Sequence, residues 1–345
     1  MITLTDREKE VLRYVVDNFI QSAAPVGSRS VSKKTDLNLS SATIRNVMSD
    51  LEEMEFLDTP HTSAGRIPTD KGYRYYVDML MNHENISKKD VYLFKEFFND
   101  KNLNFLDSQD IFNETSRLLG KITRLLSVVS QPNISKGVFE KLEFVSVASD
   151  KILVVLKIKS GILKTVIMEI TSEIPKSKLE KLSTYINEKL SGLTLELIRN
   201  TYVERIGEYR HKEPELIQSF IDSFEKLYAD EESCNKIYIG GTGDLIMQPE
   251  FEDPKNFKEI INLAEDKNLV IHIFDKDMSV ENKVQISIGE ENKDAKLKNY
   301  SVITTSYNLG GVKGNIGVIG PKRMNYAKMV SLLEYTSKLI NDKSI

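Results

Sequence analysis

Cysteine, histidine and tryptophan are scarce in this 345-residue chain, which has one cysteine, four histidines and no tryptophan. A single thiol forms no internal disulfide, and no C-x-x-C or H-x-x-x-H spacing occurs, so a disulfide framework and a structural zinc site are excluded. The longest aliphatic run, Ile152–Leu156, is far shorter than the roughly 20 residues of a membrane-spanning helix. The polar start of the chain also lacks the apolar core of a signal peptide. These absences predict a soluble cytoplasmic protein with no metal, no cofactor and no membrane association.

An excess of one charge is also absent, because 47 Lys+Arg stand against 51 Asp+Glu, a formal net charge of −4 at pH 7. Net charge averages over all domains, so this mild acidity does not exclude a face that binds nucleic acid. The proportions of apolar residues (40%) and charged residues (28%) are ordinary for a chain with buried cores. At about 100–200 residues per domain, the length predicts two or three domains.

The first eighty residues have the pattern of short helices followed by a hairpin. The range Thr5–Glu8 matches a capping box, and an apolar stripe follows it until Pro25 ends the helix. Two further helices and then a β-hairpin over residues 56–68 are predicted, with a fourth helix after the hairpin. The residues expected to cap the later helices are Ser28, Ser40 and either Thr69 or Asp70.

The third predicted helix has two distinct sides. At about 100° per residue, Ile44, Met48 and Leu51 fall on one side, whereas Arg45 and Asn46 fall on the other. We expect the apolar side to pack on the first helix and the polar side to remain free. Three helices and a hairpin of this kind form a winged helix-turn-helix, in which the third helix enters the major groove. A three-helix domain with no DNA partner would show the same periodicity, so the pattern alone leaves DNA binding open.

The residue types on the free side suit DNA, because an arginine can bond a guanine bidentately and an asparagine an adenine. Cations also gather where a duplex would dock: residues 25–49 hold four Lys/Arg against one acid, and residues 60–77 hold three against one. His61 is predicted to lie near DNA, although it could instead only shape the turn. The predicted DNA-binding residues are Ser28, Arg29, Lys33, Ser40, Ser41, Thr43, Arg45, Asn46, His61, Thr62, Ser63, Arg66, Lys71 and Arg74.

Each domain has few cations, and phosphate neutralisation supplies most of the affinity for DNA. One copy is therefore expected to bind weakly. We predict a dimer on an inverted repeat whose half-sites are a whole number of helical turns apart, each turn being about 10–10.5 base pairs.

The remainder of the chain predicts a mixed α+β arrangement. From Asp110 to Val129 the apolar spacing indicates a helix that packs within its domain or against a partner helix. The predicted strands cover residues 143–148, 152–159, 166–170, 236–239, 269–274, 284–288, 300–307 and 314–319. The predicted helices cover residues 176–190, 214–229, 256–264 and 325–340.

Catalytic motifs are missing. Gly240–Gly243 follows a predicted strand, but no Gly-Lys-Ser/Thr comes after it, so a tight turn is favoured over a phosphate cradle. Cys234 has no histidine nearby in sequence, and no serine lies in a G-x-S-x-G elbow. We predict no catalytic residue and no enzyme. A nucleotide-handling enzyme with a DNA-docking domain is the alternative from a different class.

Three segments together resemble a known family. Ser40–Met54 joined to Pro60–Asp78 is similar to the heat-inducible transcription repressors of the HrcA family, and Gly317–Tyr326 resembles the end of that family's sequences. The Ala-Thr-Ile-Arg-Asn core occurs in several bacterial winged-helix families, whereas its combination with Pro-His-Thr-Ser-Ala-Gly-Arg is highly specific. Glu55 is a departure, because this family often has glycine there, and a left-handed backbone at a non-glycine residue costs about 1 kcal/mol.

The resemblance implies a domain plan and a function. The plan is a winged-helix domain over residues 1–82, a linker over 83–109, a discontinuous GAF-like α/β domain over 110–180 and 265–345, and an inserted α+β dimerisation domain over 181–264. The implied function is a homodimer that binds an inverted-repeat operator in double-stranded DNA and represses heat-shock chaperone operons. The implied protein partner is a GroEL-type chaperonin that keeps the repressor active. The alternative within this class is a ligand-responsive winged-helix regulator whose GAF-like domain senses a metabolite.

Overall fold

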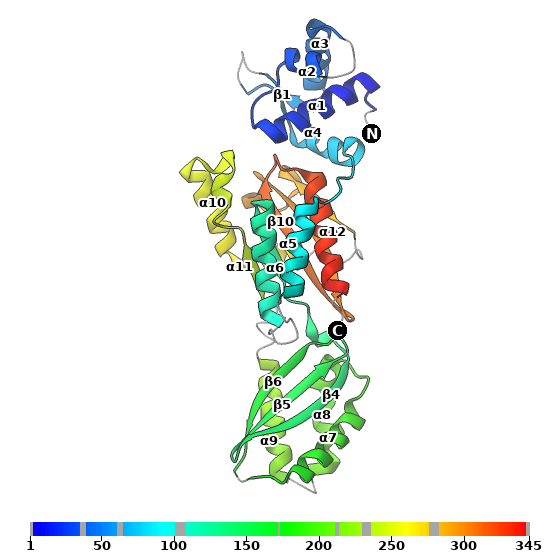
Figure 1. Ribbon diagram of the computed structural model, residues 1–345, viewed down its shortest axis with the longest axis vertical. Helices are drawn as coiled ribbons and strands as arrows, with labels where there is room; N and C mark the ends of the chain where they lie inside the picture. The colour runs from blue at the N-terminus through cyan, green and yellow to red at the C-terminus, as the bar shows by residue number, and fades with distance from the viewer. Residues whose placement is uncertain are drawn as a thin grey trace.

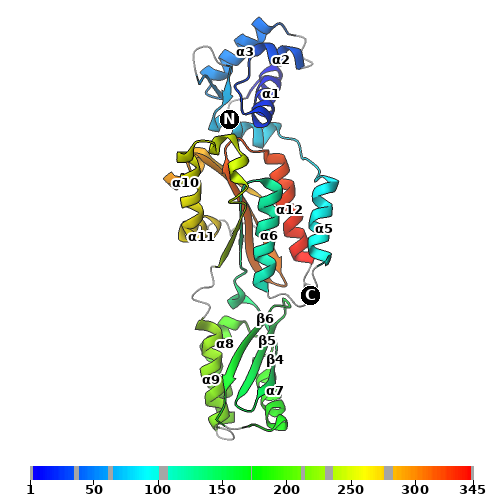
Figure 2. The ribbon, with the colours of Figure 1, turned by 60° about the vertical axis from the view of Figure 1, so that its left-hand side comes forward.

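The computed structural model describes residues 3–34, 39–60, 65–100, 108–171, 173–210, 214–229, 236–275 and 283–342. Three units follow one another along an elongated molecule (Figures 1 and 2). A small helical unit from the N-terminal part of the chain lies at one end. A five-stranded sheet with helices lies in the middle, and a three-stranded sheet backed by helices lies at the other end.

The N-terminal unit has the predicted order of elements. Its elements are α1 (Asp6–Ser22), α2 (Ser28–Lys34), α3 (Ser41–Glu53), β1 (Leu57–Asp58), β2 (Ile67–Pro68), α4 (Asp70–Tyr75) and the π-helical turn η1 (Tyr76–Leu80). Strands β1 and β2 pair in an antiparallel hairpin. The three helices bury one apolar core, whose members include Val11, Leu12, Val15, Val16, Val31, Ile44, Met48 and Leu51.

Side chains cap three of these helices as predicted. The N–H of Thr5 donates to Glu8 Oε2 (2.6 Å), and the N–H of Glu8 donates to Thr5 Oγ1 (3.4 Å), which completes the capping box. Ser40 caps α3 and Thr69 caps α4, each accepting from the N–H three residues further on. The prediction for Ser28 was wrong, because Ser28 is already the first residue of α2.

The middle unit is a sandwich of helices around an antiparallel sheet of strand order β7-β3-β10-β9-β8. The strands are β3 (Leu126–Ser130), β7 (Ile237–Gly240), β8 (Gln285–Ile288), β9 (Tyr300–Leu309) and β10 (Val312–Pro321). Helices α6 (Ser108–Thr123) and α12 (Tyr326–Asp342) cover one face, and α10 (Pro254–Glu265) and α11 (Lys267–Asp275) cover the other (Figure 2). Successive strand residues face opposite layers, so Val128 packs toward α11 and Val129 toward α6.

The third unit is the antiparallel meander β4 (Phe139–Ala148), β5 (Lys151–Ile158) and β6 (Leu163–Glu169). Helices α7 (Lys176–Leu190), α8 (Leu195–Arg210) and α9 (Pro214–Ala229) cover one of its faces and share an apolar core with it. The chain leaves the larger sheet after β3 and returns to it at β7, where the N–H of Gln131 donates to the carbonyl of Lys236 (2.8 Å). The residues between these two adjacent strands therefore form a separate unit.

This grouping differs from the domain boundaries that we expected. The range 110–180 contributes strands to two different sheets, and β7 and α10, expected within 181–264, belong to the middle unit. The reason is that β4–β6 bury their apolar face against α7–α9, through contacts such as Val154 and Leu182 in one core. Which sheet a strand joins depends on such non-local packing, and strand periodicity carries no information about it.

Two elements differ from the prediction for a local reason. Residues 269–274, expected as a strand, lie in helix α11, which buries Val270 and Phe274 one turn apart. A short apolar run does not distinguish a buried strand from a buried helix. The helix predicted from Asp110 ends at Thr123, because Arg124 has a left-handed backbone (φ 55°) and β3 starts two residues later.

Two helices were not predicted at all. Helix α5 (Lys88–Asp100) lies within the expected linker 83–109, and helix α8 follows α7. Helix α5 packs on α12 through Phe94, which is fully buried with its ring centre 5.8 Å from that of Tyr335. None of the helices in the described ranges is long and apolar enough to cross a membrane.

Candidate nucleic-acid interface

Helix α3 lies at the end of the molecule that is farthest from the other two units (Figures 1 and 2). Its inward residues Ile44 and Leu51 are completely buried. Arg45 and Asn46, on the opposite side, are exposed, and neither forms a hydrogen bond or ion pair within the described part of the chain. An unengaged guanidinium and carboxamide are therefore presented to solvent near the start of the helix.

The first turn of α3 is fixed by its own side chains. The Ser40 hydroxyl accepts the N–H of Thr43 (3.1 Å) and lies 3.0 Å from the Thr43 hydroxyl. Ser41 is exposed beside them. Because Ser40 and Ser41 at this end of α3 are exposed, the positive end of the helix dipole is accessible to a phosphate.

Helix α2 adds cations near α3. Arg29 and Lys33 are exposed and have no partner among the described residues, and Ser28 is half-buried. Lys34, the last residue of α2, is exposed as well. No acidic side chain in the described ranges neutralises Arg29 or Lys33, so both remain available to phosphate oxygens.

The base of the hairpin is held to α3 by an ion pair. Glu52 accepts from Arg66 Nη2 (2.7 Å) and from the Thr59 hydroxyl (2.5 Å). The backbone of Arg66 also pairs with Val26 in both directions, at 2.9 Å each. The Arg66 guanidinium, predicted to contact DNA, therefore orients the hairpin relative to α3. His61, Thr62 and Ser63 lie outside the described residues.

Lys71, also predicted to contact DNA, binds the end of α3. Its ammonium donates to the Met54 carbonyl (2.8 Å) and to Glu55 Oε2 (3.2 Å), and it lies 5.1 Å from the centre of the Phe56 ring. A cation at a helix C-terminus bonds the last carbonyls and complements the dipole. The contacts of Lys71 thus stabilise the junction of α3 with the hairpin.

Glu55, where the family often has glycine, follows the last residues of α3 and has a left-handed backbone. Its φ is 64°, its N–H donates to Glu52, and the N–H of Phe56 donates to Leu51, which is the Schellman pattern of helix termination. Glycine adopts this backbone without strain, whereas a side chain costs about 1 kcal/mol. The hairpin geometry is kept despite that cost.

Replacing Glu55 with glycine is therefore expected to stabilise the chain by about 0.5–1 kcal/mol. Loss of the ion pair with Lys71 offsets little of this gain in stability, because the Glu55 side chain is 80% exposed and exposed pairs contribute about 0–1 kcal/mol. Urea unfolding followed by circular dichroism measures the change. Glu53→Gly, in the helical part of α3, is the control and should destabilise. A Glu55→Gly variant less stable than the parent would contradict the strain.

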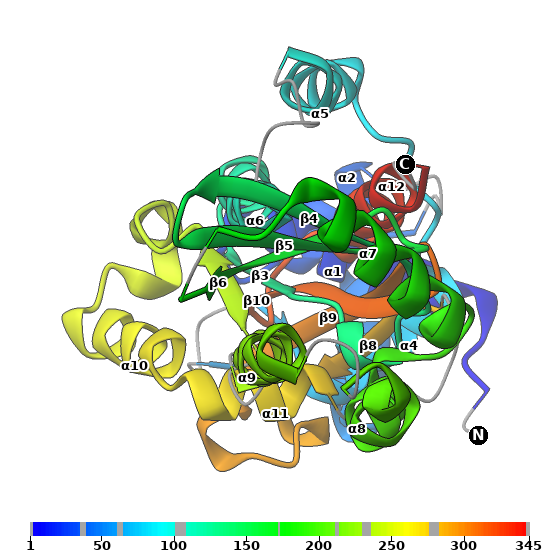
Figure 3. The same cartoon turned by 90° about the horizontal axis from the view of Figure 1, so that it is seen from below.

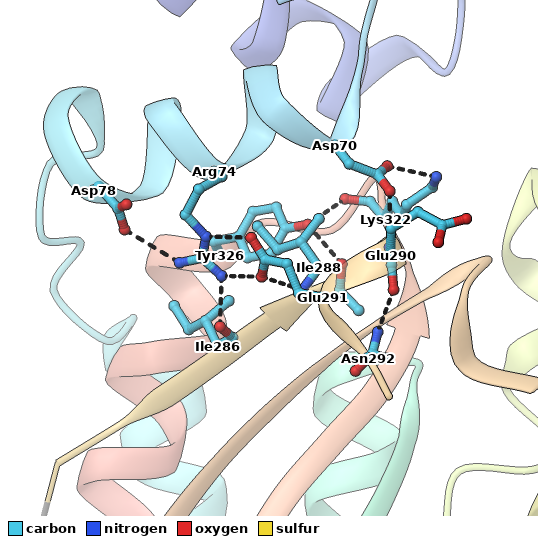
Figure 4. Close-up of polar contacts among 12 residues, drawn as sticks. Asp70, Arg74, Asp78, Ile286, Ile288, Glu290, Glu291, Asn292, Lys322 and Tyr326 are labelled. Carbon is cyan, nitrogen blue, oxygen red and sulfur yellow. Dashed lines mark hydrogen bonds and ion pairs between the residues drawn. The ribbon is translucent and has the colours of Figure 1, made fainter. Parts of the chain in front are cut away.

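Arg74, another predicted DNA contact, faces the middle unit instead (Figure 4). Its guanidinium forms an ion pair with Glu291 and donates to the Ile286 carbonyl (2.6 Å) and to Asp78 (3.1 Å). The hydrogen bonds with Glu291 raise the pKa of Arg74 above its ordinary value. Glu291 lies more than two hundred residues away along the chain, and no local pattern could have revealed this contact.

The glycine motifs have packing roles. A Cβ on Gly240 would lie 2.2 Å from the Ser116 carbonyl oxygen, and one on Gly241 would lie 2.0 Å from that of Leu125. These glycines let the end of β7 approach α6. Gly310 and Gly311 have positive φ (55° and 95°) and form the tight turn between β9 and β10. Within the described ranges, no group of three or more His, Cys, Asp or Glu residues could hold a metal ion.

The buried three-helix core, the free polar side of α3 and the hairpin define a winged-helix DNA-binding protein. Residues 3–80 match the family model "Winged helix-turn-helix transcription repressor, HrcA DNA-binding", and residues 109–330 match "HrcA protein C terminal domain". The chain belongs to the HrcA family of heat-inducible transcription repressors.

Relatives cover nearly the full length. The "Heat-inducible transcription repressor HrcA" of Chlorobium phaeobacteroides (strain BS1) is 38% identical over 338 residues, 96% of each chain. That of Chlorobaculum tepidum is 39% identical over 346 residues, covering 98% of this chain and 97% of the relative. A solved structure described only as a hypothetical protein has a TM-score of 0.69 at 24% identity, over 99% of this chain and 98% of that one, and shows the same fold. The relatives are named transcription repressors, so the chain is a regulator and not an enzyme.

Proposed function

We propose that this repressor acts in the cytoplasm as a homodimer on an inverted-repeat operator of heat-shock chaperone operons. The observation that carries the proposal is the exposure of Arg45 and Asn46 on α3, without partners among the described residues and at the free end of the molecule. A helix in the major groove reads bases with such side chains, arginine on guanine and asparagine on adenine.

Phosphate contacts are assigned to fewer residues than the sequence suggested. Arg29 and Lys33 on α2 and Ser41 at the start of α3 are exposed and are the proposed contacts to the DNA backbone. Ser28 and Thr43 are half-buried, and the Ser40 hydroxyl is engaged in the helix cap, which leaves them secondary positions. Because so few cations face the duplex, one copy neutralises few phosphates, and two copies are needed for tight binding.

A second copy is proposed to bind the outer face of the three-stranded sheet. We propose that the third unit is the dimerisation domain and that the middle unit is the GAF-like domain. The face opposite α7–α9 exposes Val145, Val147, Leu163 and Ile167, which are 46%, 64%, 54% and 53% exposed. Val145, Leu153 and Ile167 are paired in register across all three strands and form one apolar row.

The orientation of this face suits a two-fold dimer. The strands lie on one side of the third unit and the helices on the other, and the sheet runs along the length of the molecule (Figures 1 and 3). A two-fold axis parallel to the long axis of the molecule, placed at this face, puts both α3 helices at the same end. That is the arrangement that an inverted repeat requires.

A titration of the full-length chain against an inverted-repeat duplex and a scrambled duplex, at two salt concentrations, tests the proposal. We expect tighter binding to the inverted repeat and a steep loss of affinity for both duplexes as salt rises, because released counterions drive binding. Footprinting should show both half-sites protected. Equal affinity for the two duplexes, or protection of one half-site only, would contradict the proposal.

We also propose that a GroEL-type chaperonin keeps the repressor active. The support is membership in a family whose repressors are named heat-inducible. In the same titration, repressor refolded with chaperonin and ATP is expected to recover more operator binding than repressor refolded without it. Equal recovery would remove the chaperonin from the account.

A further inference from the structure

We propose that Asp70 and Arg74, together with Glu291 and Lys322, determine which half-site spacing the dimer accepts. We call these four residues the reader clamp. They fix the orientation of the winged-helix unit relative to the middle unit (Figure 4). The inference rests on the proposed function, since spacing matters only for a dimer on an inverted repeat.

Arg74 forms the more directional half of the reader clamp. Its Nε donates to Glu291 Oε1 (2.7 Å), Nη2 donates to the other carboxylate oxygen, and Nη2 also donates to the Ile286 carbonyl (2.6 Å). Glu291 is itself held, because the N–H of Ile288 donates to its Oε2 (2.8 Å). On the other side, Asp78 accepts from Arg74 Nη1 (3.1 Å). A bidentate arginine–carboxylate pair fixes direction as well as distance.

Asp70 forms the second half, one turn before Arg74 on the same helix α4, and its partners Glu290 and Lys322 lie in two separate connections of the middle unit. Its Oδ1 accepts from Lys322 Nζ (2.6 Å), and its Oδ2 accepts from the N–H of Glu290 (3.0 Å). The carboxylate comes so near that a Cβ on Gly289 would lie 1.9 Å from Oδ2. Gly289 also has a positive φ of 53°. Only glycine fits a backbone that must accept this close approach.

Apolar and backbone contacts surround the reader clamp. Tyr73, which is 2% exposed, lies with its ring centre 5.9 Å from that of Tyr326, and both belong to a hydrophobic core that continues from the winged-helix unit into the middle unit.

Arg323 donates to the Ile20 carbonyl at the end of α1 and is held by Glu250 (2.6 Å). The winged-helix unit is thus attached at Asp70, at Arg74 and at the end of α1. The pairs at Asp70 and Arg74, one turn apart on α4, set the orientation of the unit, whereas the apolar contacts and the hydrogen bond at α1 keep the two units together.

Rigid mounting has a direct consequence for DNA recognition. One inserted base pair moves a half-site by about 3.4 Å and rotates it by about 34° around the duplex, since a turn takes about 10–10.5 base pairs and 34–36 Å. A winged-helix unit held by the reader clamp cannot follow that rotation. A winged-helix unit without these directional pairs, held by the apolar contacts, the hydrogen bond at α1 and the segment between η1 and α5, residues 81–87, can follow it. The clamp therefore makes spacing part of specificity.

The test uses full-length protein and operators whose central spacer is changed by one or two base pairs. For the parent, we expect affinity to fall at least 30-fold at the wrong spacing. For Asp70→Asn/Arg74→Met, we expect the fall to be no more than about threefold. Affinity for a duplex with one half-site should be the same for both proteins. Arg117→Met, which removes an exposed ion pair with Glu114 on α6, is the matched control and should keep the spacing preference.

The affinity for the duplex with one half-site distinguishes the reader clamp from a direct contact between Arg74 and DNA. If Arg74 bound a phosphate, its loss would weaken the single half-site and reduce the salt slope by about one. That result would overturn the inference. Tighter binding of the double variant to the best operator would also overturn it, because the reader clamp would then hold the winged-helix unit away from DNA. Unchanged spacing preference in the double variant would overturn it as well.

A measurement without DNA keeps failure of the inference distinct from failure of the proposed function. Spin labels at positions 53 and 334, both exposed, in a Cys234→Ser background, report the distance between α3 and α12 by pulsed electron resonance. We expect one narrow distribution for the parent and a broad one for the double variant. Gly289→Ala, which pushes on Asp70 from the other side, should broaden it too. Equally narrow distance distributions in the parent and both variants would show that these residues do not hold the winged-helix unit.

Discussion

Replacing Ile167 with glutamate is expected to convert the proposed dimer into a monomer and to weaken operator binding by about 100-fold or more. Ile167 lies at one end of the apolar row that crosses β4, β5 and β6. In a two-fold contact each residue of the row meets the partner's copy of the same surface, so a single substitution places two buried, unpaired charges in the interface. Loss of the second half-site removes the avidity of linked binding, which is worth about 10²–10⁴.

The design of this experiment separates association from folding. Ile167 is 53% exposed in the single chain, so the monomer is expected to keep its circular dichroism spectrum and to unfold within about 0.5 kcal/mol of the parent. Thr184→Glu introduces the same charge at an exposed position of α7, on the helix side of the third unit, and should leave the dimer intact. Sedimentation velocity measures the oligomeric state. An Ile167→Glu protein that stays dimeric would place the interface elsewhere.

Replacing Arg45 with alanine is expected to reduce the ratio of operator affinity to random-DNA affinity by about 5–150-fold, which corresponds to about 1–3 kcal/mol for one bidentate base contact. Stability should not change, because Arg45 is exposed and has no partner among the described residues. The substitution also removes one cation, and that part of the loss is shared by all sequences.

Two comparisons isolate the base-reading part of the effect. Arg29→Ala removes a cation that we assign to phosphate, so it should weaken operator and random DNA by the same factor and lower the salt slope by about one. Asn46→Ala should behave like Arg45→Ala but affect a different base pair of the half-site. An Arg45→Ala protein with the parent's operator-to-random ratio would remove this residue from base recognition.

The winged-helix unit was predictable because its determinants are local. Thr5 and Ser40 cap helices that start at the next residue, and the periodicity of α3 separates Ile44 and Leu51 from Arg45 along one short helix. Such features depend on residues three or four positions apart, which is the range that sequence patterns report.

The roles of Arg66, Lys71 and Arg74 were not predictable for the opposite reason. Composition marks all three as cations near a DNA-binding helix, yet Arg66 binds Glu52, Lys71 binds the end of α3, and Arg74 binds Glu291. A basic residue that binds phosphate and one that binds a carboxylate are the same letter in the sequence. Their partners are set by tertiary contacts, and the grouping of strands into two sheets was missed for the same reason.

The central claim is that the outward side of α3 reads base edges, and base-analogue interference tests it most directly. Each half-site guanine is replaced in turn by 7-deazaguanine, which lacks the N7 acceptor of the major groove, and affinity is measured for the parent and for Arg45→Ala. The account predicts one guanine whose replacement weakens the parent by about fivefold or more and leaves the variant unaffected, because the two changes remove the same contact. Equal losses for both proteins at every guanine would contradict it.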